Sequence, residues 1–277
     1  MQKIGVIGLG IIGGTWARHY EAAGALAGAW NRTPKPEFPH WKGGPAEVAS
    51  ASEVIQIVVA DPPAVRDILK RMLPELSPGR VVVQSSTIDP ASSEEFQRMV
   101  VARGARYLEA PFTGSKPAAE QRQTVFYLGG EPELAAWLDP LLALVSSTRM
   151  LVGTTAQAAA LKLAMNLNIA AQMEGLIEAL TLARRAGVSD EHFFQALAKN
   201  AGYSGLVKLK EQKLRDGDYA PQFSVKHMLK DMRLASAMPA GRGLPSLEVL
   251  CKSLAAADGA GMADEDFSAL IKVLTRP

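Results

Sequence analysis

The chain has 277 residues, 48% hydrophobic and 21% charged, which is enough apolar sequence for two domains with a substantial buried core. Its formal charge is only +2, from 30 Lys and Arg against 28 Asp and Glu residues without long blocks of one sign, so we expect no nucleic-acid partner. The single cysteine, Cys251, excludes an internal disulfide and has no neighbours at metal-ligand spacing, so we expect a reducing compartment, the cytoplasm, and no metal.

Short β-branched runs alternate with amphipathic stretches through the first half of the chain. We expect strands at Lys3–Leu9, Leu26–Trp30, Val54–Val59, Val81–Gln84, Tyr107–Ala110 and Val125–Leu128, and helices at Ile12–Ala23, Pro63–Met72 and Ser93–Arg103. This alternation is typical of βαβ units and a mostly parallel sheet. The Pro-rich piece Thr33–Pro45 is expected to be a loop, because proline lacks the N–H that a helix needs. The first strand follows the N-terminus without a basic region or a cleavage motif, so we expect no signal peptide.

A glycine-rich turn joins the first strand to the first helix, with the sequence Gly8-Leu9-Gly10-Ile11-Ile12-Gly13. Between a strand and a helix, GxGxxG predicts a dinucleotide pyrophosphate site. Gly8 permits the tight turn, Gly10 lets the backbone approach the pyrophosphate, and Gly13 lets helix and strand pack closely, while the helix N-terminus supplies free N–H groups. We therefore predict that these six residues bind the cofactor. An incidental glycine-rich turn is the alternative.

Asn31-Arg32-Thr33 follows the end of the second expected strand, where an NAD enzyme usually presents an acid to the ribose hydroxyls. Without a carboxylate to repel a 2′-phosphate, Arg32 can bind that dianion through charge-assisted hydrogen bonds, and Asn31 and Thr33 add neutral donors. These three residues predict NADP(H) rather than NAD. The alternative is that Arg32 is a solvated loop arginine.

Ala, Leu, Met and Lys replace the β-branched runs after Leu151. Helices are expected at Thr155–Ala186, Asp190–Ala201, Val207–Asp216, Lys226–Ala237, Leu247–Asp258 and Asp264–Leu274. The most apolar stretch, Ala156–Met173, approaches membrane-spanning length but contains Lys162, Asn166 and other polar residues, so we expect a buried helix and no membrane partner.

These elements predict an α/β fold. Residues 1–154 are expected to form an NADP-binding Rossmann domain with a doubly wound, mostly parallel sheet. Residues 155–277 are expected to form an all-α domain that is joined by a long helix and serves substrate binding and oligomerisation. So much apolar helical surface exceeds what one chain can cover, which predicts a homodimer or homotetramer.

Four further segments carry a family resemblance: Ser86-Thr87-Ile88-Asp89-Pro90, Glu109-Ala110-Pro111-Phe112-Thr113-Gly114-Ser115-Lys116, Lys162-Leu163-Ala164-Met165-Asn166 and Lys230-Asp231-Met232-Arg233-Leu234-Ala235. With the glycine turn, they make the chain resemble the β-hydroxyacid dehydrogenase family over nearly its whole length. That family includes 3-hydroxyisobutyrate dehydrogenase and the glyoxylate and succinic semialdehyde reductases, and its C-terminal domain is of the 6-phosphogluconate dehydrogenase type.

Two of these segments follow expected strands, at the sheet edge where doubly wound folds bind ligands. The resemblance implies that Ser86 and Thr87 contact the cofactor, although a helix cap is an equal alternative from the residues alone. Thr113, Gly114 and Ser115 offer hydroxyl and backbone N–H groups that can hold a small carboxylate, and they look like the family's substrate clamp. The family usually has Ser where this chain has Thr113; a structural turn is the alternative.

Lys162 interrupts an otherwise apolar helix, where a charge is costly unless it is paired or used. Spacing alone leaves a snorkelling lysine equally open, but the resemblance implies that Lys162 is the catalytic general acid/base. Asn166 lies four residues on, on the same helical face, where it can orient the ammonium and the substrate or make an interhelical hydrogen bond.

The last segment lies in an expected helix of the second half. The resemblance implies that Lys230 and the upstream Phe223 contact the cofactor and that Asp231 lies by the substrate pocket. A solvated Lys-Asp pair is the alternative.

The resemblance implies an NADP(H)-dependent oxidoreductase, a β-hydroxyacid dehydrogenase or semialdehyde reductase. It would interconvert a small 3-hydroxy acid, or a 2-hydroxy acid such as glycolate, and its semialdehyde or oxo acid. An imine reductase of the same fold is one alternative, although such proteins usually carry another residue at the position of Lys162. A dehydrogenase-like scaffold that has lost its chemistry is the other, and the presence of Lys162 argues against it.

Overall fold

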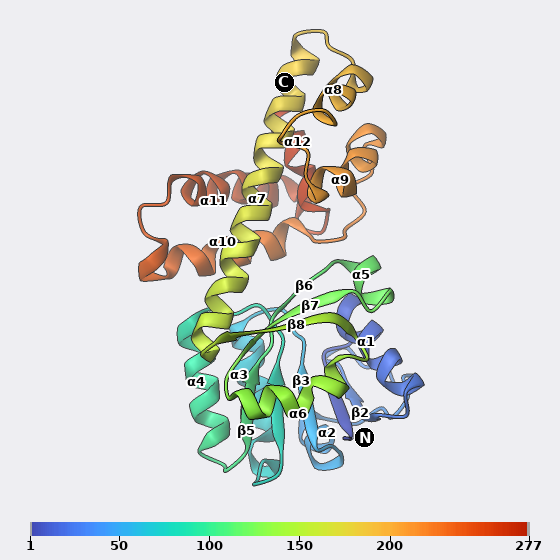
Figure 1. Ribbon diagram of the computed structural model, residues 1–277, viewed down its shortest axis with the longest axis vertical. Coiled ribbons are helices and arrows are strands. Elements are labelled where there is room, and N and C mark those ends of the chain that lie inside the picture. Colours follow the sequence, from blue (N-terminus) through green and yellow to red (C-terminus); the bar gives the residue numbers. More distant parts are fainter. Residues whose placement is uncertain (1, 276–277) are drawn as a thin grey trace. The chain divides into compact units, whose positions relative to one another are not determined.

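A computed structural model describes residues 2–275 (Figure 1). The chain divides into two compact units, Met1–Lys162 and Leu163–Pro277, and each is described by itself. The helix α7 (Thr155–Arg185) begins in the first unit and continues into the second. The boundary expected between residues 154 and 155 coincides with the start of α7, whereas the division into units falls inside the helix.

The first unit is built on an eight-stranded, mostly parallel sheet with the order β2-β1-β3-β4-β5-β7-β6, and β8 pairs with β7. The strands are β1 (Ile4–Ile7), β2 (Leu26–Trp30), β3 (Val54–Ile57), β4 (Val81–Gln84), β5 (Arg106–Glu109), β6 (Phe112–Thr113), β7 (Thr124–Gly129) and β8 (Ser146–Gly153). The strands β1 to β5 run parallel, and β7 is antiparallel to both β5 and β6. All six expected strands are present. The strands β6 and β8 were not expected, because β6 has two residues and most of β8 is exposed.

Apolar side chains cover both faces of this sheet, as a doubly wound fold requires. Within β4, Val81 and Val83 belong to one buried cluster and Val82 to another. The helices that follow the strands are α1 (Ile11–Ala22), α2 (Pro45–Ala51), α3 (Pro62–Met72), α4 (Pro90–Val101), α5 (Lys116–Glu120) and α6 (Pro132–Leu142). The expected fold class is confirmed.

Proline begins several of these helices rather than interrupting them. Asp61 and Asp89 accept the backbone N–H of Ala64 and Ser92 and so cap α3 and α4, each of which has Pro at its first position. The expectation that Pro45 lies in a loop was therefore wrong. Pro45 starts α2, where the missing N–H costs nothing because the first turn has no partner for it.

Among the described residues of the second unit, the secondary-structure elements are helices, apart from an isolated β-bridge between Ser224 and Asp266. Beyond α7 it contains α8 (Asp190–Leu197), α9 (Gly205–Asp216), α10 (Val225–Ala237), α11 (Pro245–Ala257) and α12 (Ile271–Thr275), with a π-helical turn at Asp258–Met262 and 3-10 turns at Pro239–Gly241 and Phe267–Leu270. Within residues 2–275, no helix combines the length and apolar character needed to cross a bilayer.

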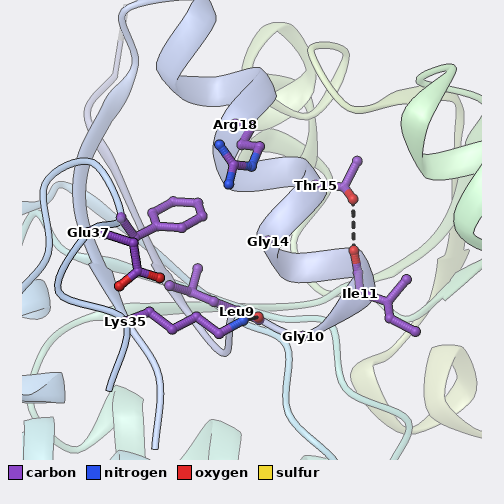
Figure 2. Close-up of a pocket in the computed structure, with 9 residues that line it drawn as sticks. Leu9, Gly10, Ile11, Gly14, Thr15, Arg18, Lys35 and Glu37 are labelled. Atoms are coloured by element: carbon purple, nitrogen blue, oxygen red, sulfur yellow. Dashed lines mark hydrogen bonds between the residues drawn. The ribbon is translucent and has the colours of Figure 1, made fainter. Parts of the chain in front are cut away.

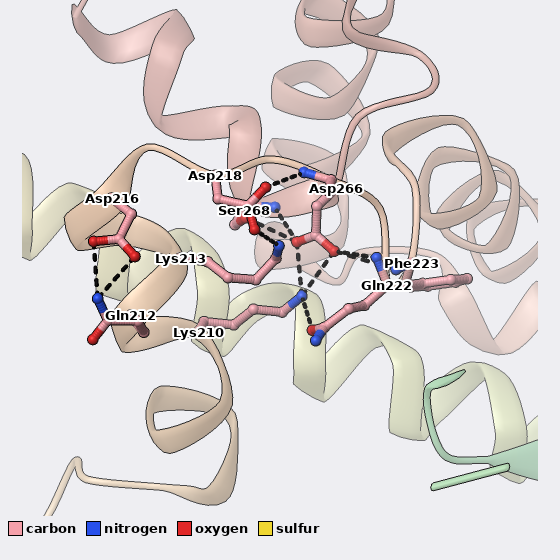
Figure 3. A network of polar contacts seen from close by, with 10 residues as sticks. Lys210, Gln212, Lys213, Asp216, Asp218, Gln222, Phe223, Asp266 and Ser268 are labelled. Atoms are coloured by element: carbon pink, nitrogen blue, oxygen red, sulfur yellow. Dashed lines mark hydrogen bonds and ion pairs between the residues drawn. The ribbon is translucent and has the colours of Figure 1, made fainter. Parts of the chain in front are cut away.

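The helix expected over Asp264–Leu274 was wrong at its N-terminal end, because Asp266 has a different role (Figure 3). Asp266 is fully buried and pairs with Lys210 of α9, whose Nζ lies 2.7 and 2.8 Å from the two carboxylate oxygens. The same carboxylate accepts the backbone N–H groups of Gln222, Phe223 and Ser268. This network ties three chain segments together and replaces the first helical turn.

Close packing at the glycine turn yields a direct test of the fold. A Cβ on Gly13 would lie 2.0 Å from the carbonyl oxygen of Gly8, whereas a Cβ on Gly14 would lie at an ordinary 3.5 Å from the carbonyl oxygen of Leu9. We expect Gly13→Ala to lower the free energy of unfolding by roughly 1–3 kcal/mol. Gly14→Ala, the matched control in the same helix, should be neutral or stabilising by up to about 1 kcal/mol. Urea denaturation checks both values, and equal effects of the two substitutions would contradict the packing.

Candidate functional site

The glycine turn leaves backbone donors open at the start of α1. Gly10 is the N-cap residue without a side-chain cap, and a Cβ on it would meet no described heavy atom within 4 Å. Gly8 has a φ of 101°, which favours glycine, and a Cβ there would lie 2.1 Å from the carbonyl oxygen of Val58. The turn is therefore tightly packed on the sheet side and open where N–H groups can meet an anion.

Asn31 connects this turn to the loop after β2. Its Oδ1 accepts the backbone N–H of Leu9 at 2.9 Å, and its Nδ2 donates to the carbonyl oxygen of Thr33 at 2.9 Å. Arg32 and Thr33 are exposed. Asn31 therefore positions the glycine turn, a structural role in addition to the expected role as a hydrogen-bond donor to the cofactor.

A cavity of about 260 Å³ lies against the turn and the first helix (Figure 2). It is lined by Leu9, Gly10, Ile11, Gly14, Thr15, Arg18, Lys35, Glu37 and Phe38. The Lys35 ammonium donates to the carbonyl oxygen of Leu9 at 2.7 Å, and the Arg18 guanidinium lies 5.1 Å from the Phe38 ring centre. Two cations and one carboxylate thus border the space beside the turn.

Sequence reasoning missed Arg18 and Lys35 and named Arg32, which does not line this cavity. Arg18 lies one helical turn beyond Gly14, and that spacing could have pointed to it. Lys35 lies in the Pro-rich loop, where no periodicity indicates which way a side chain faces.

Ser86 and Thr87 follow β4 at the carboxyl edge of the sheet. Ser86 is 2% exposed, and its hydroxyl accepts the backbone N–H of Val59 at 2.8 Å, while Thr87 is half-buried. The cap of α4 is Asp89, so neither Ser86 nor Thr87 caps that helix. Of the two residues, Thr87 is the one with accessible surface for a ligand.

A buried polar cluster lies directly behind this segment. The Glu109 carboxylate, at the end of β5, accepts hydrogen bonds from Gln84 Nε2 at 2.7 Å, Ser93 Oγ at 2.6 Å and Tyr107 Oη at 2.7 Å. Burial, with a smaller contribution from the charge of Asp89, raises the pKa of Glu109 to about 8, although these three hydrogen bonds lower it. Sequence reasoning gave this carboxylate no role.

The residues expected to bind the substrate carboxylate lie at the end of β6 and in the turn after it. Thr113 ends β6 and is half-buried. Gly114 has a φ of 130°, which favours glycine, and a Cβ there would lie 3.0 Å from the Thr124 side chain. Ser115 is the N-cap residue of α5 but makes no side-chain cap hydrogen bond. The three residues lie together in one tight turn.

Lys162 is buried, with 8% of its surface exposed. Its Nζ lies 5.7 Å from the centre of the Phe112 ring, close enough for a cation–π contact. Phe112 in turn packs edge-on against Trp16 of α1 at 4.7 Å between ring centres. Little of Lys162 therefore reaches solvent.

In the second unit, Asn166 of α7 donates from Nδ2 to Asp231 Oδ2 of α10 at 2.6 Å, and both residues are at most 2% exposed. Only the amide nitrogen can donate to a carboxylate, so Asp231 sets the orientation of the Asn166 amide. The Lys230 ammonium lies 2.6 Å from the other Asp231 oxygen. Because Asp231 is buried, the alternative of a solvated Lys-Asp pair fails.

Phe223 lies just before α10 and is partly buried. Its backbone N–H donates to Asp266, and its ring stacks on His227 with 6.4 Å between ring centres. Within residues 2–275, no three His, Cys, Asp or Glu side chains gather in a group that could hold a metal ion.

Comparisons with known proteins agree with this geometry. Residues 3–153 match the NAD binding domain of 6-phosphogluconate dehydrogenase, and residues 156–274 match the model described as NAD-binding of NADP-dependent 3-hydroxyisobutyrate dehydrogenase. The chloroplastic glyoxylate/succinic semialdehyde reductase 2 of Arabidopsis thaliana is 29% identical, over 98% of this chain and 79% of that protein. The solved structure of 3-hydroxyisobutyrate dehydrogenase from Salmonella typhimurium has a TM-score of 0.87 and 27% identity, over 99% of this chain and 100% of that chain.

A further relative is not named as an enzyme. The cytokine-like nuclear factor N-PAC of Mus musculus is 30% identical over 86% of this chain, but the chain spans only 44% of that protein.

The glycine turn on a parallel sheet, followed by a helical unit, defines the class of nicotinamide-dependent dehydrogenases and reductases. Within that class, the chain belongs to the β-hydroxyacid dehydrogenase family. The family resemblance of the sequence motifs is confirmed.

The raised pKa of Glu109 predicts a pH-dependent stability. Between the ordinary value of 4.5 and about 8, the unfolded chain releases a proton that the folded protein keeps, so stability falls as pH rises through this window. Glu109→Gln removes this titration. We expect its stability relative to the unmodified protein to increase by up to about 1.4 kcal/mol per pH unit between pH 5 and 8.

Chemical denaturation at several pH values measures this difference. Glu94→Gln, which changes an exposed carboxylate on the same helix as Ser93, serves as the control and should show no such trend. A Glu109→Gln difference that stays constant with pH would contradict the assignment.

Proposed function

We propose that the protein is an NADP(H)-dependent oxidoreductase that interconverts a small hydroxy acid and its semialdehyde or oxo acid, with Lys162 as general acid/base. The burial of Lys162 beside an aromatic ring carries the proposal, because an ionisable side chain in such a place is costly unless it is paired or used. The name of the Arabidopsis relative supports semialdehydes and glyoxylate as candidate substrates and favours reduction.

The open N–H groups of the glycine turn suit a pyrophosphate, and the close packing at Gly8 and Gly13 holds them in place. Residues 31–33 contain no carboxylate, and Arg18 and Lys35 add positive charge to the neighbouring cavity. Together with Arg32, these cations favour binding of the 2′-phosphate of NADP(H). Glu37 also lines the cavity, but its single negative charge is outnumbered by the two cations, so the net charge of the lining is positive. Thr87, Phe223 and Lys230 are proposed to contact the nicotinamide half, as the family resemblance implies.

The substrate carboxylate is proposed to bind at Thr113, Gly114 and Ser115, through hydroxyl and backbone N–H groups. Asn166 is proposed to hold the reacting end of the substrate. Asp231 would repel a carboxylate substrate directly, so we assign it the orientation of Asn166, which its 2.6 Å hydrogen bond supports.

NADPH supplies the hydride when it is bound. In the reducing direction, Lys162 stabilises the negative charge that develops on the substrate oxygen and then donates a proton to that oxygen. In the oxidising direction, the neutral amine accepts the hydroxyl proton. The Phe112 ring lies beside the cationic form and stabilises it without offering a competing proton acceptor.

The N-PAC relative keeps open a role other than catalysis, for which a dehydrogenase-like scaffold would suffice. The presence of Lys162 favours an enzyme. We also propose that the protein is cytoplasmic and forms a homodimer or homotetramer. Exposed apolar side chains of the helical unit, such as Leu182 and Val188, support the assembly.

The lysine assignment predicts the effect of its removal. Lys162→Ala should lower kcat by about 100-fold to 10,000-fold while the Kd for NADPH stays nearly unchanged, because the ammonium acts on the substrate oxygen. Lys208→Ala, at an exposed lysine, is the matched control and should keep full turnover. Steady-state kinetics with glyoxylate and succinic semialdehyde measure kcat, and a Lys162→Ala enzyme with most of its turnover would refute the role.

The cofactor preference predicts a second outcome. Arg32→Asp should weaken NADPH binding about 10-fold to 100-fold more than NADH binding, because a carboxylate there repels the 2′-phosphate and removes its cation. Arg242→Asp, an exposed arginine of the other unit, should weaken neither. Fluorescence titration with both nucleotides gives the ratio. Equal losses for NADPH and NADH would show that Arg32 does not select the cofactor.

A further inference from the structure

Glu109 is a buried carboxylate that the proposed chemistry does not use. It has no exposed surface, so it can neither touch a substrate nor exchange a proton with one. A hydrophobic residue of similar size would fill the same space without the cost of burying a carboxyl group. The presence of Glu109 therefore calls for an explanation in the contacts that it makes.

One of these contacts leads to the cofactor edge of the sheet. Gln84 Nε2 donates both to Glu109 Oε1 at 2.7 Å and to the carbonyl oxygen of Ser86 at 2.9 Å, while Gln84 Oε1 accepts the N–H of Ser86 at 2.7 Å. A single side-chain amide thus binds both backbone groups of Ser86. The two backbone groups of Ser86 set which way round this amide lies, and Glu109 anchors the amide by accepting from its nitrogen as a second partner.

Other buried contacts hold the same segment in place. The Ser86 hydroxyl accepts the N–H of Val59, in the loop after β3. Ser85 Oγ accepts from Gln56 Nε2 at 3.1 Å, and Gln56 Oε1 accepts from the Tyr20 hydroxyl of α1 at 3.0 Å. Ser85 and Ser86 are therefore fixed by two buried amides, and the half-buried Thr87 follows immediately.

We propose that Glu109 is a positioning residue for the nicotinamide side of the cofactor site: by anchoring the Gln84 amide, it holds Ser86 and with it the segment that presents Thr87. This inference rests on the proposed function, since it assigns the nicotinamide half of NADPH to that segment. The adenosine half belongs to the glycine turn and the loop after β2, which Glu109 does not contact. Removal of the Glu109 carboxyl group should therefore weaken the binding of the nicotinamide half of the cofactor and not that of the adenosine half.

The experiment compares two ligands on the full-length protein. NADPH carries the nicotinamide, whereas adenosine 2′,5′-bisphosphate carries only the adenosine half. Glu109→Leu should weaken NADPH binding about tenfold or more, as expected for a lost buried polar contact, and leave the bisphosphate within about threefold. Glu109→Gln keeps an acceptor for Gln84 and donors for Ser93 and Tyr107, so it should bind both ligands nearly as the unmodified protein does.

Two further variants separate positioning from general damage. Leu108→Ala empties part of the core from the neighbouring position of the same strand, and it should lose stability without the selective loss of NADPH affinity. Gln84→Leu removes the amide itself and should reproduce the Glu109→Leu pattern, which provides the test if Glu109→Leu fails to fold.

Each outcome is decisive. Selective loss of NADPH affinity in Glu109→Leu or Gln84→Leu, with recovery in Glu109→Gln, supports the inference. Equal loss of both ligands, or loss of neither, overturns it while leaving the proposed function standing. An unmodified protein that binds neither ligand would instead refute the proposed function.

Discussion

The carboxyl edge of the parallel sheet has to meet two opposed demands. Its loops must leave backbone N–H groups open for a ligand, yet those groups must be held still. At the glycine turn, close packing holds the backbone still, because Gly8 and Gly13 lie too close to backbone oxygens for either to carry a side chain. After β4 the same demand is met by the buried amides of Gln56 and Gln84, which bind the next loop from behind.

Three buried ionisable sites show how environment separates structural from chemical roles. Lys210 and Asp266 neutralise each other, and the carboxylate also binds backbone N–H groups of its neighbours, so the pair holds segments of the helical unit together. Glu109 has hydrogen-bonding neighbours but no cation, and burial raises its pKa. Lys162 is buried beside an aromatic ring, a contact that stabilises a cation. Of the three, Lys162 is the one that we propose acts on a substrate.

Local patterns predicted much of this molecule. The expected strands, the glycine turn and the helices of the second half follow from periodicity and from residues with one dominant conformational preference. The short strand β6 and the exposed edge strand β8 carry little such signal. The expected helix over Asp264–Leu274 failed because Asp266 pairs with a lysine of another helix, which no local pattern encodes.

The same reasoning explains which site residues could be found. Gly8, Lys162 and Asn166 belong to segments that resemble a family, so their roles could be proposed from sequence. Arg18 has helical spacing from Gly14 as a signal, whereas Lys35 lies in a loop without periodicity and is identified by the cavity beside the turn. Gln84 and Glu109 meet because β4 and β5 are neighbours in the sheet, and no local sequence pattern joins them.

We propose that this nicotinamide-dependent enzyme reduces the carbonyl group of a small carboxylate. The rate of NADPH oxidation by the purified protein tests this proposal, with glyoxylate, succinic semialdehyde, other short semialdehydes and 2-oxo acids, and a cyclic imine as substrates. We expect turnover on at least one carboxylate-bearing carbonyl compound and none on the imine. Turnover confined to the imine, or no NADPH oxidation with any of these compounds, would contradict it.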